Sequence, residues 1–100
     1  MGENDNIPQM TPSFENICRK DEKGIEYWSS RDLCGAMGYS AYWKFQRVID
    51  KAIKVAGEKG MNVDEHFNQA VDMVKIGNGS FRKVNIFRLS RMACMIIAEN

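Results

Sequence analysis

Four basic residues lie at helical spacing near the middle of the chain. An α-helix advances about 100° per residue, so their side chains would share an arc of about 80° on one side of a helix. A cationic stripe of this kind can bind nucleic-acid phosphates, although by itself it is more often a solvated helix surface. The stripe consists of Lys44, Arg47, Lys51 and Lys54.

Other residues near the stripe favour nucleic acid as its ligand. Arg82 and Lys83 follow an Asn-Gly turn, and hairpin tips beside a helix pair often contact phosphates. Tyr42 and Trp43 flank the stripe and can stack on bases or pack against sugars. With these residues added, phosphate binding and a solvated surface are equally supported. Arg31, near the start of the preceding predicted helix, is a secondary candidate for DNA contact.

The residues that most often carry catalysis are sparse. His66 is the only histidine and lies beside Phe67, so a structural or surface role is favoured over a general base. The acidic residues are dispersed, and no GxSxG, phosphate-binding loop or HExxH motif occurs. Cys18, Cys34 and Cys94 form no CxxC pattern, which favours free thiols over disulfides or a zinc site. We therefore expect no enzymatic activity, no metal and no cofactor.

The composition is that of one small globular domain. The chain has 100 residues, of which 44% are hydrophobic and 27% are charged. No apolar run approaches the roughly 20 residues of a membrane span, and no signal peptide is evident. With free thiols, these features favour a cytoplasmic protein. The net charge of +1 does not itself indicate a nucleic-acid partner, so the case depends on where the charges lie.

A pair of helices joined by a tight turn is predicted to position the stripe. Ser29 or Ser30 caps the first helix, Asp32 completes a capping box, and Gly38 ends the helix. Such a helix-turn-helix-like pair can pack as a structural unit or present its second helix to DNA. The predicted apolar side of the first helix consists of Leu33, Ala36 and Met37.

The second helix contains the stripe and the clearest apolar periodicity of the chain. Ser40 is its predicted cap, and Gly60 ends it after about Lys59. Trp43 lies beside the basic arc and is expected to be incompletely buried. Six apolar residues within an arc of about 140° are predicted to face the core. They are Phe45, Val48, Ile49, Ala52, Ile53 and Ala56.

The remaining segments complete a predicted α+β fold of about four helices and one β-hairpin. Residues 1–11 form a flexible tail, and Pro12 opens either a short helix or an extended segment. A turn then leads into a brief strand at residues 25–28, and Asp64 caps a single helical turn farther on. Two β-prone runs around residues 77–80 predict the hairpin.

The last predicted helix starts at Ser90 and is apolar nearly all round, which is typical of a helix buried on several sides. The chain ends at Asn100, directly after this helix. We therefore expect residues 12–100 to be a domain truncated at its C-terminal end, with the missing continuation covering part of the helix. The same apolar surface offers a route to oligomerisation.

Many short segments match, in the same order, the N-terminal part of one known family. They are FENI (14–17), EYWS (26–29), RDL (31–33), MGYS (37–40), Trp43, Phe45, VI (48–49), KA (51–52), HF (66–67), VKIG (74–77), Gly79, Arg82, LSR (89–91) and AC (93–94). In these segments the chain resembles the DNA damage-inducible protein D family from about residue 14 to its C-terminus. Met92, Cys34 and Gly35 depart from the family pattern and leave the basic stripe unaffected.

The resemblance implies a BRO-N-like domain, the module also found in phage antirepressors and baculovirus repeated-ORF proteins. It also implies a bacterial or prophage protein of the SOS response, acting as a DNA-binding or regulatory module without enzymatic activity. Both duplex and single-stranded DNA remain open as ligands. The alternative is a protein-interaction module that binds a repressor or a DNA-repair protein through the apolar last helix. The family offers no DNA-contacting residues to transfer, so the candidate residues rest on the helix-face argument.

Overall fold

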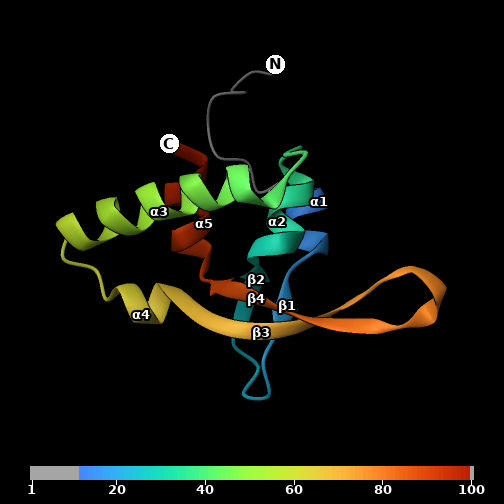
Figure 1. Cartoon of the computed structure of the whole chain (residues 1–100). Coiled ribbons are helices and arrows are strands. Elements are labelled where there is room, and N and C mark those ends of the chain that lie inside the picture. The colour runs from blue at the N-terminus through green and yellow to red at the C-terminus, as the bar shows by residue number, and fades with distance from the viewer. Residues whose placement is uncertain (1–11, 100) are drawn as a thin grey trace.

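The computed structural model of the chain describes residues 12–99, so the predicted tail at residues 1–11 lies outside it. In this range, a helical layer lies on one side of an antiparallel sheet (Figure 1). The predicted α+β class is confirmed. The helices are α1 (Pro12–Asn16), α2 (Ser30–Ala36), α3 (Tyr42–Glu58), α4 (Val63–His66) and α5 (Arg91–Glu99), with the 3₁₀ turn η1 (Gly77–Gly79).

The sheet has the strand order β1-β2-β4-β3, and every neighbouring pair is antiparallel. β2 corresponds to the brief strand predicted at residues 25–28, whereas β1 has no predicted counterpart. The predicted hairpin is confirmed as β3 and β4, which pair from Phe67↔Leu89 out to Lys75↔Phe81. The strands are β1 (Arg19–Lys20), β2 (Glu26–Ser29), β3 (Phe67–Lys75) and β4 (Phe81–Leu89).

The core fills the space between the helical layer and the base of the sheet. All six apolar residues predicted for α3 belong to it, four of them at 0% exposure and Val48 and Ile53 partly buried. Trp28 of β2 is also fully buried, stacks on Phe14 at 4.4 Å, and donates its indole N–H to the Phe14 carbonyl at 2.9 Å. A ring of this size with its polar group satisfied is an effective core residue.

α2 confirms its predicted boundaries and corrects two details. Gly38 has φ +81° and ends the helix with two backbone bonds of the Schellman type, Gly38 N–H to Gly35 and Tyr39 N–H to Cys34. Ser29 is confirmed as the cap, because its Oγ accepts from Arg31 N–H, but the capping box is wrong, since the Asp32 carboxylate binds Arg19. The apolar side is also partly wrong. Leu33 and Cys34 are buried, while Ala36 and Met37 are exposed.

α3 begins one residue later than predicted, after Ala41 rather than Ser40, and no side-chain bond caps it. Its end is confirmed, since Gly60 has φ +79° and Met61 N–H donates to the Ala56 carbonyl at 3.0 Å. Met61 also packs against the core, which adds the hydrophobic contact common at such helix ends.

The short helices differ from their predictions mainly in which residues cap them. α1 confirms the helical alternative at Pro12. The cap of α4 is Asn62, whose side chain accepts from Glu65 N–H, and not the predicted Asp64. Ser90 is confirmed as the cap of α5, because its Oγ accepts from Ala93 N–H at 3.0 Å. Along residues 12–99, no helix is long and apolar enough to cross a bilayer.

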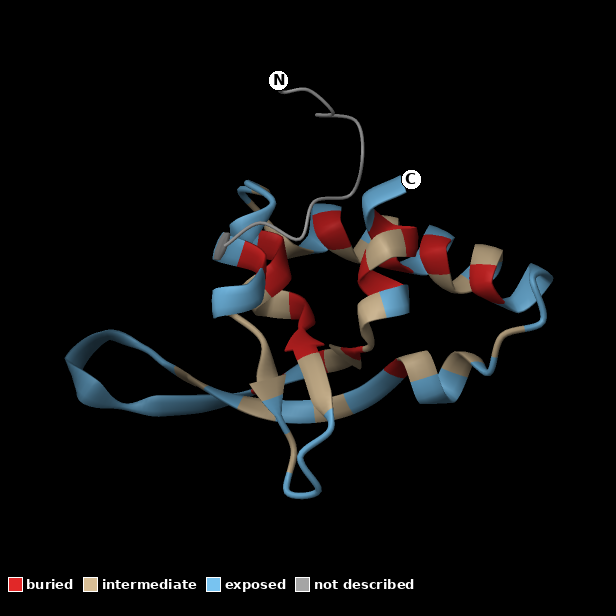
Figure 2. Ribbon diagram, turned by 180° about the vertical axis from the view of Figure 1, so that it is seen from behind, coloured by how far each residue is buried: buried red, intermediate tan, exposed pale blue. Residues whose placement is uncertain are grey.

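The hairpin extends well beyond the helices that cover its base. Side chains alternate along a strand, so Phe67, Phe87 and Leu89 share the core-facing side of the hairpin with residues farther out along it. At the base these residues are buried or packed against the core. Toward the tip the same side carries Met73 and Phe81, which are 51% and 60% exposed. Figure 2 shows this change from buried to exposed along the hairpin, whose outer part, residues 71–85, is called the arm below.

Candidate nucleic-acid interface

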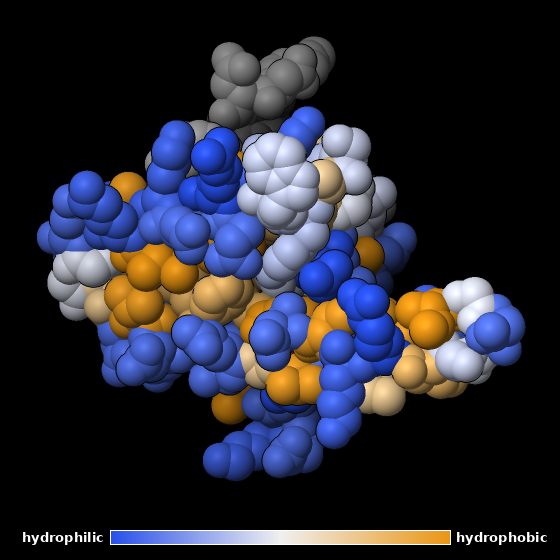
Figure 3. Space-filling model, viewed as in Figure 1, coloured by the Kyte–Doolittle hydropathy of each residue, from blue (hydrophilic) through white to orange (hydrophobic). Residues whose placement is uncertain are grey.

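The four basic residues of the stripe are all exposed on α3. Helical spacing puts them on the side opposite Phe45 and Ile49, so they point away from the core. Figure 3 shows hydrophilic side chains along the part of the surface formed by α3. The structure therefore presents the stripe as a continuous outer surface of one long helix.

Two carboxylates lie beside the C-terminal half of the stripe. Asp50 and Glu58 are exposed and lie four residues before and after Lys54, which is the spacing of neighbours on a helix surface. Lys44 and Lys51 have no acidic residue three or four positions away. Asp50 also lies three residues after Arg47, so Lys44 and Lys51 are the two stripe residues without a neighbouring carboxylate on α3.

Trp43 lies at the edge of the stripe, and its side chain is 61% exposed. Lys44 Nζ is 5.7 Å from the centroid of its ring, and Arg47 Cζ is 5.8 Å away. These are cation–π distances. The expectation that Trp43 is incompletely buried is confirmed, and the contacts place an exposed aromatic ring among cations.

Arg31 has different surroundings from the stripe. It is half-buried, and its guanidinium stacks over the Tyr42 ring at 4.2 Å. Burial is also the main cause of the raised pKa of Tyr42. Arg31 therefore packs α2 against the start of α3, and its contact with DNA stays a prediction.

Arg82 and Lys83 are both exposed on the arm but point to opposite faces of the hairpin. Lys83 pairs with Met73 and shares the core-facing side, whereas Arg82 pairs with Val74 on the other side. The two side chains therefore do not form one cluster, and only Lys83 lies on the side that carries the core residues at its base.

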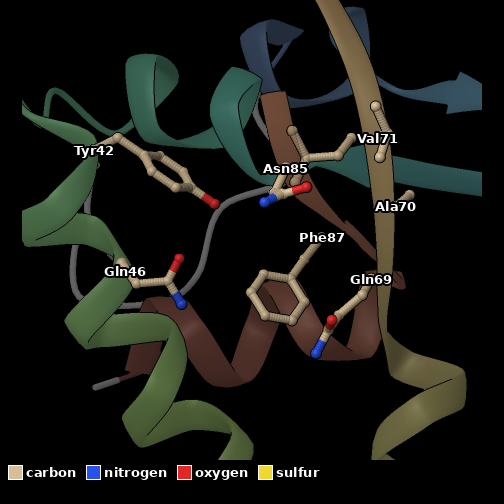
Figure 4. A pocket seen from close by; sticks show the side chains of 8 residues that line it. Tyr42, Gln46, Gln69, Ala70, Val71, Asn85 and Phe87 are labelled. Atoms are coloured by element: carbon tan, nitrogen blue, oxygen red, sulfur yellow. The ribbon is translucent and has the colours of Figure 1, made fainter. Parts of the chain in front are cut away.

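A pocket of about 420 Å³ opens where the hairpin emerges from beneath α3. Figure 4 shows side chains from three elements around it, with Tyr42 and Gln46 from α3 facing β3 and β4. Its lining consists of Tyr42, Gln46, Gln69, Ala70, Val71, Asn85, Ile86 and Phe87. The pocket thus combines two aromatic rings with three side-chain amides. Sequence reasoning missed these amides, because they belong to three separate elements that only tertiary packing brings together.

One buried serine holds the walls of this pocket together. Ser30 is fully buried, and its Oγ accepts the Phe87 backbone N–H at 2.9 Å and lies 2.7 Å from the Tyr42 hydroxyl. These bonds connect the start of α2 to the start of α3 and to β4. The Tyr42 ring and the strand that carries Phe87 are thereby held in place.

Ion pairs elsewhere join elements of the fold. Arg91 binds Glu15 and Glu26 at 2.9 Å, and its hydrogen bonds lower the pKa of Glu26. Arg19 binds Asp32 at 2.9 Å and Asp72 at 3.2 Å. The first cluster connects α5 to α1 and β2, and the second connects β1 to α2 and β3.

His66 and the cysteines have structural surroundings. His66 Nδ1 lies 2.6 Å from Ser90 Oγ, next to the cap of α5. The three cysteines are free thiols, and burial raises the pKa of each. Among the residues with described positions, no group of three or more His, Cys, Asp or Glu side chains could hold a metal ion.

The sequence is 38% identical over 87 residues to DNA damage-inducible protein D of Escherichia coli strain K12. The alignment covers 87% of this chain and 32% of that protein, so the chain spans about a third of the length of this curated relative. No family model matches the chain. No solved structure matches it significantly. The identity and its extent along the chain support the expected relationship to the DNA damage-inducible protein D family.

Proposed function

We propose that this domain is a DNA-binding regulatory module of a cytoplasmic, damage-inducible protein, which acts by binding rather than by catalysis. Its BRO-N-like character, and a place among prophage or antirepressor-like proteins, are part of the same proposal. The damage response is suggested by the name of the relative, DNA damage-inducible protein D.

The observation that carries the proposal is the outward surface of α3. Lys44, Arg47 and Lys51 project from one side of the helix, and Trp43 lies beside them with its ring exposed. Cations spaced along a rigid helix suit a row of phosphates, and an exposed aromatic ring among them suits a sugar or a base. Lys83 on the arm would add a phosphate contact at a distance from α3, while Lys54, Arg82 and Arg31 are secondary.

A salt titration of DNA binding tests the proposal. Fluorescence anisotropy would measure the affinity of the parent chain and of an Arg47→Ala/Lys51→Ala variant for labelled DNA at several salt concentrations. Each lost phosphate contact lowers the slope of log K against log salt by about 1, so the variant should lose about 2 from the slope.

The matched control is Lys20→Ala/Lys23→Ala, which removes the same charge from the β1–β2 hairpin, where Lys20 and Lys23 are exposed. It should keep the slope of the parent. If the two variants weaken binding equally, general charge rather than the α3 surface is responsible. If the α3 variant binds like the parent, the proposal for this surface is wrong.

A protein-interaction module is the second candidate, and the exposed apolar residues of the arm favour it. Val71, Met73, Ile76 and Phe81 are between 44% and 60% exposed, whereas the apolar residues of α5 are mostly buried apart from Met92 and Ala98. Exposed apolar patches commonly mark protein contacts. A repressor or DNA-repair protein as the partner, and an oligomer formed through α5, stay predictions. Failure of the parent chain to bind DNA at any salt concentration would favour this candidate.

A further inference from the structure

We propose that the pocket between α3 and the hairpin holds an unstacked nucleobase of a single-stranded nucleic acid, whose backbone continues along the arm past Lys83 and Lys75. This inference rests on the proposed function, because it names the class of nucleic acid that the domain binds.

The lining of the pocket suits a planar, uncharged, hydrogen-bonding group. Its volume of about 420 Å³ lies in the range of small-ligand pockets. Gln69 and Asn85 offer amide donors and acceptors, and no charged side chain belongs to the lining. The third amide, Gln46, donates through Nε2 to the Asp50 carboxylate at 3.1 Å and has its carbonyl oxygen left as an acceptor. Side-chain amides match the donor and acceptor pattern on the edge of a base. A phosphate, in contrast, would find no cation within the pocket.

The apolar part of the lining provides a surface for stacking. The Tyr42 and Phe87 rings reach the pocket from α3 and from β4 (Figure 4). Because Ser30 bonds both the Tyr42 hydroxyl and the Phe87 backbone, the Tyr42 ring and the strand that carries Phe87 are positioned before any ligand binds. Preorganised rings lose little conformational entropy on binding, which favours stacking on a flat partner.

The surface beyond the pocket suits a flexible polyanion. On the core-facing side of the arm, Val71↔Asn85 is followed by Met73↔Lys83 and Lys75↔Phe81. This side of the hairpin carries two lysines and an exposed phenylalanine, and its β3 and β4 residues include no carboxylate. Asp72, the acidic residue of the hairpin, lies on the opposite side and binds Arg19.

Charge and aromatic residues together favour a single strand over a duplex. Alternating cations and rings are typical of surfaces that bind single-stranded nucleic acid, where unpaired bases are free to leave the stack. In a duplex the base edges are paired, so entry into a pocket requires unpairing at a cost of a few kcal/mol. The strand would therefore place one base in the pocket against Tyr42 and Phe87 and its phosphates beside the lysines.

An amide substitution with a matched control tests the pocket in the full 100-residue chain. Asn85→Leu removes hydrogen-bonding capacity at similar size, and Asn68→Leu makes the same change on the opposite side of the hairpin. Both asparagines are exposed, so neither change is expected to unfold the domain. Anisotropy with a labelled oligothymidylate and with a labelled duplex would measure the dissociation constants. Asn85→Leu should weaken binding of the single strand about tenfold, and Asn68→Leu should not. Duplex affinity should be the same for both variants.

Further measurements separate failure of the pocket proposal from failure of the proposed function. Gln69→Leu, whose side chain also lines the pocket, should repeat the selective loss, and a urea midpoint like that of the parent confirms folding of each variant. If Asn85→Leu and Gln69→Leu both bind the oligonucleotide like the parent while Arg47→Ala/Lys51→Ala does not, the proposal for the pocket is overturned. The proposal for the α3 surface is then supported. If thymidine monophosphate binds in a direct titration but the oligonucleotide does not, the strand is overturned as the source of the base. Absence of all nucleic-acid binding overturns both proposals.

Discussion

The two ends of the β3–β4 hairpin follow the same residue alternation but have opposite surroundings. At the base, Phe67 and Leu89 are 2% and 0% exposed, whereas at the tip their counterpart Phe81 is 60% exposed. All three lie on the same side of the hairpin. The difference arises from the helical layer, which covers only the base. An apolar residue in a strand therefore serves the core or a binding surface according to what lies above it.

The largest expected effect comes from truncating one residue at each end of the hairpin. Leu89→Ala removes a fully buried side chain and should lower the free energy of unfolding by about 2–5 kcal/mol. Phe81→Ala should change it by no more than about 0.5 kcal/mol, because the ring is largely solvated already. Urea denaturation followed by circular dichroism measures both. Equal losses would show that the arm is covered in solution.

A smaller effect is expected from two serines, one that bonds the base of the hairpin and one at its tip. Ser30→Ala removes the acceptor of the Phe87 backbone N–H and should cost about 1–3 kcal/mol, since a buried donor is left unsatisfied. Ser80→Ala at the exposed tip leaves the backbone bond from Ile76 N–H to the Ser80 carbonyl intact and should be nearly neutral. The same denaturation experiment compares them. A neutral Ser30→Ala would mean that water replaces the hydroxyl.

The smallest effect is expected from the Glu26 carboxylate of β2, which Arg91 of α5 binds. Hydrogen bonds from Arg91 lower the pKa of Glu26 below its ordinary value of 4.5. A carboxyl with a lowered folded-state pKa stabilises the fold above its unfolded pKa, and this stability is lost as the pH falls through the folded-state value. The melting temperature of the parent should therefore decrease below pH about 4.5 more steeply than that of Glu26→Gln. Glu22→Gln, in the exposed β1–β2 turn, is the control and should keep the parent profile.

Local patterns in the sequence predicted the long elements well. α3 extends over 17 residues, enough turns for its apolar arc to stand out, and its six predicted core residues all contribute to the core. α2 has only seven residues, so Cys34 could not be distinguished from Ala36 by periodicity. The two-residue β1 has no periodicity of its own, because it exists only through pairing with β2.

The candidate site also has a part that local sequence patterns predicted and a part that they did not. The basic stripe could be read from helical spacing, since its residues belong to one element. The amides of the pocket come from α3, β3 and β4, and nothing in their local sequence marks them. Arg82 and Lys83 looked like a pair because they are adjacent, yet strand alternation separates their side chains.

The sequence by itself determined the two faces of α3 and the presence of the hairpin, because both depend on repeats of 3.6 and of 2 residues within continuous segments. Only the tertiary structure decided how far the helices cover the hairpin, and therefore that Val71, Met73 and Phe81 remain exposed. It also decided that Gln46, Gln69 and Asn85 meet in one pocket. These outcomes depend on where separate elements pack. The hydrophobic effect that drives this packing is non-directional, so the local sequence does not show which elements will meet.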